Sequence, residues 1–220
     1  MLAPVKIIRL SANSYSERSY WQAIRELCCR TGNNGAPIPR LRWQLFGKLW
    51  IEPYEKLIPD WTFAALVDGK VIGYLTGCPQ SKRFRWRRLT LCRVPLMLEL
   101  AMGRYLTDRS LFGFVLRSLP AELAIRRRFS TATRTAIESS LPAHLHINVD
   151  TDFRSAGIGR KLIEAFLASL REQAVPGVHL YCGPAPLEFY RRMGFGELGM
   201  IRFNGAEIYA LSMFLGNFRP

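Results

Sequence analysis

The chain has 220 residues, of which 49% are apolar and 22% are charged, so it is long enough to bury a hydrophobic core without disulfides or metal ions. Its formal charge of +14 favours an anionic partner, such as a nucleic acid, a lipid surface, an acidic protein or a phosphorylated cofactor. The five cysteines include no C-x-x-C pair, which argues against both a disulfide framework and a zinc site.

The first 79 residues predict a strand, two helices and a hairpin. A strand is expected over residues 5–10 and a helix over 16–30, with a polar start. A second helix, rich in aromatic residues and cations, is expected over 41–50. Two β-type runs, 62–67 and 70–76, flank an Asp-Gly dipeptide that is typical of a two-residue hairpin turn.

Residues 80–142 have a different composition. Between Gln80 and Thr135 there are 13 lysines and arginines against three acids, a net +10 of the total +14. The segment is also rich in leucine, phenylalanine and methionine, and it predicts two or three amphipathic helices. Because no linker-like composition bounds it, we interpret it as an insertion into a single domain that spans residues 1–220.

A strand is expected over residues 144–149, where apolar and polar residues alternate. One face of this strand carries apolar side chains and the other carries His144, His146 and Asn148. A turn with two glycines, Arg154–Gly159, follows and leads into a helix that extends to about residue 174.

The end of the chain predicts three further elements. A strand is expected over 178–182, a short helix over 186–193, and a hairpin whose strands, 200–203 and 206–214, flank an Asn-Gly dipeptide. The order of elements as a whole predicts a mixed α/β fold.

The turn between the strand and the long helix is a candidate anion site. The first turn of a helix leaves backbone N–H groups without partners, its dipole end is positive, and glycines let a ligand approach closely. Arg160 and Lys161 stand in that first turn, where cations are disfavoured by roughly 0.3–1 kcal/mol each unless an anion is bound. The alternative is an ordinary turn with two solvated cations.

The pattern Arg-x-x-Gly-x-Gly at Arg154–Gly159 resembles the acyl-CoA-binding motif of the GNAT superfamily of N-acetyltransferases. Residues 187–195, where Phe189-Tyr190 precedes Gly194-Phe195, resemble the second motif of that superfamily. Within it, Ile51–Tyr54 and Ala143–Ile147 are similar to bacterial relatives of the acetyltransferase-like domain of O-GlcNAcase.

The resemblance implies a mixed, mostly antiparallel sheet flanked by helices, with the helical insertion between the third and fourth strands. It also implies an N-acyltransferase (EC 2.3.1.-) that transfers an acetyl or other acyl group from acyl-CoA to a primary amine by direct attack, with no metal. The cofactor-binding residues that it implies are Asn148, Val149, Arg154, Ser155, Ala156, Gly157, Ile158, Gly159, Arg160 and Tyr190.

Three residues are candidates for proton transfer. The resemblance assigns Tyr190 as the hydrogen-bond or proton donor to the departing thiolate. His144 and His146 share a strand face with Asn148 and titrate in the useful range, so either is a candidate general base, although both also suit a structural role. Gly183 stands where the superfamily commonly has Asn, and this leaves a catalytically inactive binding domain as an alternative.

Several questions about partners and location stay open at this point. The basic insertion could cover the acceptor side, bind an acidic partner such as an acyl carrier protein, or contact a membrane surface. The high positive charge would also suit nucleic-acid binding, but the sequence contains no recognisable nucleic-acid-binding module. A homodimer is a further alternative. Because the start of the chain lacks the apolar core of a signal peptide, we expect a cytoplasmic protein.

Overall fold

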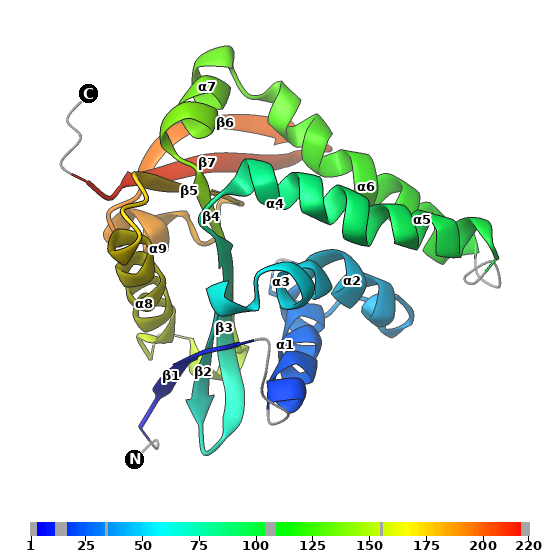
Figure 1. Ribbon diagram of the computed structural model, residues 1–220, viewed down its shortest axis with the longest axis horizontal. Helices are drawn as coiled ribbons and strands as arrows, with labels where there is room; N and C mark the ends of the chain where they lie inside the picture. The colour runs from blue at the N-terminus through cyan, green and yellow to red at the C-terminus, as the bar shows by residue number, and fades with distance from the viewer. Residues whose placement is uncertain (1–3, 12–16, 34, 104–108, 155, 217–220) are drawn as a thin grey trace. The chain divides into compact units, whose positions relative to one another are not determined.

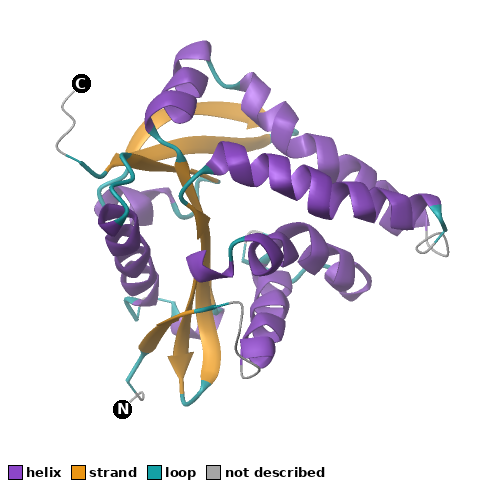
Figure 2. Cartoon of the chain, in the orientation of Figure 1, coloured by secondary structure: helices purple, strands orange, loops and turns teal. Residues whose placement is uncertain are grey.

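The computed structural model describes residues 4–11, 17–33, 35–103, 109–154 and 156–216, and its helices and strands alternate singly only from β4 to β6 (Figure 1, Figure 2). The chain divides into two compact units. The first contains Met1–Pro79 and Leu145–Val175, and the second contains Gln80–His144 and Pro176–Pro220. Each unit therefore draws on two separate stretches of the chain.

Seven strands form one sheet. In their order across the sheet they are β1 (Lys6–Arg9), β2 (Thr62–Val67), β3 (Lys70–Cys78), β4 (Ala143–Val149), β5 (Gly177–Cys182), β7 (Ala206–Phe214) and β6 (Gly196–Phe203). The pairs β1·β2, β2·β3, β5·β7 and β6·β7 are antiparallel, and β4·β5 is parallel. The expected mixed, mostly antiparallel sheet is confirmed.

Strand β4 belongs to both units. It pairs with β5 through Ala143 with Val178 and His144 with His179, all within the second unit. From Leu145 onward it runs through the first unit, where the next residue after the strand, Asp150, donates its N–H to the Ile72 carbonyl of β3 at 2.9 Å.

Strands β2 and β3 form the core of the first unit. Every residue of β2 is buried, as is every residue of β3 after its first. Such continuous burial requires cover on both faces of the sheet. The predicted turn between them is confirmed, because Asp68 (φ 49°) and Gly69 (φ 74°) both adopt the left-handed conformation that a two-residue hairpin of this type needs.

The helices of the first unit are α1 (Glu17–Thr31), α2 (Trp43–Trp50), α3 (Glu52–Leu57) and α8 (Ile158–Glu172), with short 3₁₀ turns at Arg40–Arg42 and Pro59–Trp61. The sequence did not predict α3. Pro53 ends the apolar pattern of α2, but it occupies the first turn of α3, where its missing N–H costs nothing.

Helix α8 packs closely on the sheet. Its apolar residues Ile158, Leu162, Phe166 and Leu170 form a buried row, and the ring of Phe166 meets Trp61 and Phe63 edge to face at 5.7 and 6.1 Å between centroids. Near the start of the helix, a Cβ at Gly73 of β3 would lie only 3.2 Å from the Ile158 side chain. Gly73 therefore allows the first turn of α8 to approach β3.

The predicted basic insertion is helical, as expected, and lies between β3 and β4. Its described helices are α4 (Ser81–Arg88), α5 (Val94–Ala101), α6 (Arg109–Arg128) and α7 (Thr131–Ser140), and a π-helical stretch, Leu89–Arg93, joins α4 to α5 without a break. The second unit also contains α9 (Leu187–Arg192), β5, β6 and β7. Among the described residues no helix is both long and apolar enough to cross a membrane.

A half-buried ion cluster joins two parts of the insertion. Arg88 of α4, which is buried, and Arg93 of the π-helical stretch both bind the Glu122 carboxylate of α6, the second at 2.9 Å. Burial alone would raise the pKa of Glu122, but the two guanidinium groups lower it more, so the net shift is downward. One carboxylate thus compensates two internal cations.

We expect Glu122→Gln to destabilise the protein by roughly 2 kcal/mol or more, because it removes the carboxylate that both internal guanidinium groups bind. The carboxylate keeps 28% of its surface exposed, which places the effect below that of a fully buried pair. Since the folded pKa is lowered, the contribution is present above the unfolded pKa of about 4.3 and is lost as pH falls through the lower, folded value.

Urea unfolding at neutral pH and in acid measures this effect. The control is Glu188→Gln, which removes the exposed pair with Arg191 and should change the free energy of unfolding by less than about 0.5 kcal/mol. Equal stability of the Glu122→Gln variant and the parent at neutral pH would contradict the assignment.

Candidate functional site

The first turn of α8 presents backbone N–H groups that its own helix does not use. Its earliest intrahelical bond runs from the Lys161 N–H to the Gly157 carbonyl, at 3.1 Å. The amides of residues 158–160 precede that bond, and no side chain of the described residues caps them. An uncapped helix start of this kind attracts an anion through both its amides and its dipole.

Gly157 shapes this turn. It adopts φ 73° and ψ 5°, the left-handed conformation that residues with a Cβ adopt at a cost. A Cβ built on it would meet no atom within 4 Å. Its small size is therefore not required by packing among the described residues, and the space beside it is open to a ligand.

The loop that leads to this turn is held by charged side chains. The Asp150 carboxylate at its start forms an ion pair with the Arg30 guanidinium of α1, at 3.0 Å. The Arg154 guanidinium lies beside Gly35, where a Cβ would come within 2.9 Å of its Nη2 atom. Sequence reasoning missed Arg30, because nothing local to α1 distinguishes it from other exposed cations.

The other predicted residues of the loop lie as follows. Ala156 and Arg160 are exposed, and Gly159 is half-buried. The Arg160 guanidinium lies 3.8 Å from Glu164, one turn along the helix. The predicted Ser155 lies outside the described residues.

Asn148 of β4 belongs to a hydrogen-bonded polar chain in the first unit. Its Nδ2 donates to the Tyr74 hydroxyl at 2.8 Å and lies 3.3 Å from His146 Nε2. Tyr74 is fully buried, and burial, followed by the nearby Cys28 thiol to which it is hydrogen bonded, raises the pKa of its phenol well above the ordinary value. Val149, the next residue, is half-buried.

Sequence reasoning did not identify Tyr74. It stands inside a continuous apolar strand, and only the pairing of β3 beside β4 brings its hydroxyl to Asn148.

His146 keeps an exposed edge, yet the surrounding protein displaces enough water to lower the pKa of its imidazole below the ordinary value. The ring is therefore neutral at pH 7. Where Asn148 Nδ2 donates to its Nε2 atom, that atom carries the lone pair and the proton is on Nδ1.

His144 lies in the second unit in a different setting. The Ser81 hydroxyl lies 2.7 Å from both the Pro142 carbonyl and His144 Nδ1. Where the hydroxyl donates to the carbonyl, its contact with the ring is accepted from an Nδ1–H. The neutral ring then carries its lone pair on Nε2. Its neighbours Phe84 and His179 lie at 5.5 and 6.2 Å between ring centroids.

Tyr190, also in the second unit, is held by aromatic packing. It lies on α9 and is 6% exposed, and its ring meets Phe195 edge to face at 5.7 Å. Burial, and then the nearby Cys182, raise the pKa of its phenol. Among the described residues none forms a hydrogen bond with its hydroxyl, which leaves this donor available to a ligand.

The predicted site residues thus fall into two groups. The loop residues, Asn148, Val149 and His146 lie in the first unit, and His144 and Tyr190 lie in the second.

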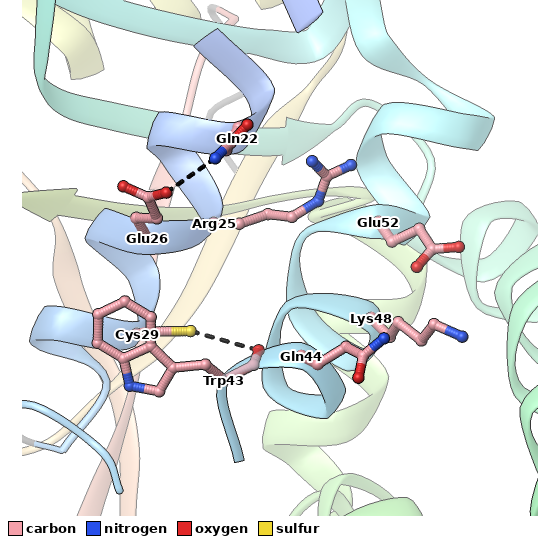
Figure 3. Close-up of a pocket in the computed structure, with 8 residues that line it drawn as sticks. All are labelled: Gln22, Arg25, Glu26, Cys29, Trp43, Gln44, Lys48 and Glu52. Carbon is pink, nitrogen blue, oxygen red and sulfur yellow. Dashed lines mark hydrogen bonds between the residues drawn. The ribbon is translucent and has the colours of Figure 1, made fainter. Parts of the chain in front are cut away.

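A separate hollow of about 470 Å³ lies between α1 and α2 (Figure 3). Two carboxylates line it, and both have partners: Gln22 donates to Glu26 at 3.1 Å, and Lys56 pairs with Glu52. None of the predicted site residues line this hollow. Within the described part of the chain, no cluster of three or more histidine, cysteine or acidic side chains could hold a metal ion.

Comparison with known proteins points to the same motifs. Residues 124–197 match the model of an acetyltransferase (GNAT) domain. This stretch includes β4, the glycine loop, α8, β5 and α9, and so it contains both motifs on which the sequence resemblance rested.

Three of the similar solved structures illustrate the fold. SsHAT is 24% identical with a TM-score of 0.70, and the match covers 97% of this chain and 99% of that one. Ard1 from Thermoplasma volcanium is 15% identical with a TM-score of 0.56, covering 97% and 99%. An agmatine N-acetyltransferase is 14% identical with a TM-score of 0.56, covering 96% and 99%. The expected GNAT fold is confirmed.

Proposed function

We propose that this chain, which has the fold of the GNAT acetyltransferases and a matching GNAT domain, transfers an acyl group from acyl-CoA to a primary amine. Acyl transfer in general is what the fold and the domain support. An amine acceptor is in keeping with the name of one similar protein, agmatine N-acetyltransferase.

The observation that carries the proposal is the uncapped first turn of α8. Its amides, the left-handed Gly157 and the open space beside that glycine suit the diphosphate of coenzyme A. The exposed Arg160 and Lys161 stand where the helix dipole disfavours cations by roughly 0.3–1 kcal/mol each, and a bound diphosphate reverses that sign.

The reaction needs three groups besides the diphosphate site. The acceptor nitrogen attacks the thioester carbonyl, whose oxygen accepts a hydrogen bond from a backbone N–H at Asn148 or Val149. As the C–S bond breaks, the Tyr190 hydroxyl donates a hydrogen bond or its proton to the sulfur. The excess proton on the acceptor nitrogen passes to a base, directly or through water.

We assign the base to His146, with His144 as the alternative. The His146 imidazole is neutral at pH 7, and its Nε2 atom takes up the proton and gives up the hydrogen bond from Asn148 as it does so. Asn148 then has two roles, since its backbone lies at the proposed carbonyl site and its amide holds the imidazole in place.

The pH profile tests this assignment. Because the pKa of His146 is lowered, we expect the acid limb of kcat/KM to lie below pH 6.5 and to disappear in His146→Gln, with a rate loss of about 10²-fold at pH 7.5. His144→Gln should keep the limb. Loss of the limb in the His144 variant alone would instead assign the base to His144.

Binding and turnover separate the proposal from its rivals. We expect acetyl-CoA to raise the melting temperature and a panel of primary amines to release free thiol from it. Coenzyme A binding without turnover of any amine would indicate an inactive binding domain. A salt-sensitive shift with nucleic acid, and none with acetyl-CoA, would indicate a nucleic-acid-binding protein.

A further inference from the structure

The helix formed by α4, the π-helical stretch and α5 has an unusual solvent face. Between Val94 and Met102, six positions are exposed, and all six are apolar: Val94, Pro95, Met97, Leu98, Ala101 and Met102. Leu98 is 57% exposed and Met102 is 76% exposed. In a helix with one buried face, these positions are the ones expected to be polar.

The exposed apolar side chains form a row along the helix. Val94, Met97, Leu98, Ala101 and Met102 follow the spacing i, i+3, i+4, i+7 and i+8, which keeps them on one face. The opposite face holds Leu96 and Leu100, which are buried in the second unit. Single exposed apolar residues are common, but a contiguous row of this kind indicates an interaction surface.

The other end of the same helix is cationic. Lys82, Arg83 and Arg87 are exposed on α4, and Trp86, 63% exposed, stands among them. Over residues 81–103 there are six cations and one acid, Glu99. The exposed positions of Ser81–Met102 therefore carry cations, apolar side chains and one threonine, Thr90, but no carboxylate.

We propose that the exposed face of residues 81–102 binds an anionic lipid bilayer, with the row from Val94 to Met102 inserted among the acyl chains and the cations of α4 against the lipid phosphates. Cations, an exposed tryptophan and a row of leucine, methionine and valine on one face are what an interfacial helix requires. The continuous helix of residues 81–101 carries six cations, too many for a segment that spans a bilayer, so the helix lies along the surface.

The charge distribution favours lipid over an acidic protein. An acidic partner would use the cations of α4 but would give no reason for six consecutive exposed positions to be apolar. A bilayer accounts for both the cations and the apolar row, because each basic residue near an anionic surface and each inserted apolar side chain contributes separately to the binding free energy. None of the exposed residues of this face is among those proposed for acyl transfer, so the two proposals can be tested separately.

The test is co-sedimentation of the full chain with vesicles of phosphatidylcholine, with and without phosphatidylglycerol. We expect binding to the mixed vesicles that weakens with salt. Met97→Ser with Leu98→Ser should lower the partition coefficient at least about tenfold, and Arg83→Gln with Arg87→Gln should lower it about 20-fold on the mixed vesicles.

Matched controls lie elsewhere on the chain. Leu41→Ser changes a leucine that is 58% exposed on the first unit, and Arg171→Gln with Arg202→Gln removes two exposed cations. Both should bind as the parent does, and unchanged melting curves show that every variant is folded.

Two results would overturn the proposal. One is the absence of binding to mixed vesicles by the folded parent. The other is sedimentation velocity data in which Met97→Ser with Leu98→Ser abolishes self-association while vesicle binding is unchanged, because the apolar row would then be an interface between copies of the chain.

Discussion

Replacing Tyr190 with phenylalanine is expected to lower kcat about 100-fold or more and to leave the KM for acyl-CoA within about twofold. The substitution removes one hydroxyl, the group proposed to donate to the departing sulfur, and a positioned proton donor contributes about 10²–10⁴-fold. An interaction made chiefly in the transition state affects kcat rather than binding.

The surroundings of Tyr190 allow this substitution to remove the hydroxyl without changing the packing of the ring. Its ring is fixed by Phe195 and Phe189, at 5.7 and 5.2 Å between centroids, and these contacts persist in phenylalanine. Because no described residue bonds to the hydroxyl, its removal leaves no internal group unsatisfied. The melting temperature should therefore change little.

Tyr209→Phe is the matched control. It removes the hydroxyl that donates to Glu207 at 3.0 Å on the neighbouring part of the sheet, and kcat should stay within about twofold. Steady-state kinetics on both variants, with a burst-phase measurement to isolate the chemical step, decide the matter. Full turnover by folded Tyr190→Phe would mean that Tyr190 is a packing residue.

The second large effect is expected at the start of α8. Gly157→Glu places a carboxylate and a side chain in the space proposed for the diphosphate, so we expect coenzyme A affinity to fall by at least about 100-fold. Two causes add: the side chain occupies the open space, and its charge repels the phosphates at short range.

Backbone strain is the confounding factor, because Gly157 has a positive φ and any substituted residue is strained there. Gly69→Glu controls for it closely. Gly69 has φ 74°, against 73° for Gly157, and an added Cβ meets nothing within 4 Å at either position. Both variants should lose similar stability, about 1–2 kcal/mol, and only Gly157→Glu should lose affinity.

Calorimetric titration with coenzyme A, beside urea unfolding of the same samples, measures both quantities. If the two variants bind equally well, the loop is not the diphosphate site, whatever their stabilities.

Local chemistry made most of the elements predictable. Asp68-Gly69 and Asn204-Gly205 both form the hairpin turns expected of them, and in each pair both residues have positive φ. The apolar residues of α8 recur at helical spacing, which is typical of a helix with one buried face, and every member of the row is buried. Such signals depend on neighbours within one turn or one hairpin, so no tertiary information is needed.

The parts that escaped prediction depend on distant partners. Tyr74 sits in an apolar run that gives no sign of a polar role, and its bond to Asn148 spans 74 positions of sequence. The division into two units has no local signal for a similar reason, because it falls within β4, between His144 and Leu145, where composition does not change. The π-helical stretch also has no local signature in Leu89–Arg93.

That stretch sets the rotational phase of the helix beyond it. Over the twelve residues from Phe84 to Leu96, an unbroken α-helix would turn Leu96 about 120° away from Phe84, yet both are buried. The wider turn of a π-helix absorbs the difference. A regular α-helix of the same length would instead turn Leu96 and Leu100 about 100° away from the buried face, whereas a one-residue deletion that restores a regular α-helix would keep them there. The π-helical turn therefore decides which of two apolar faces the protein shows.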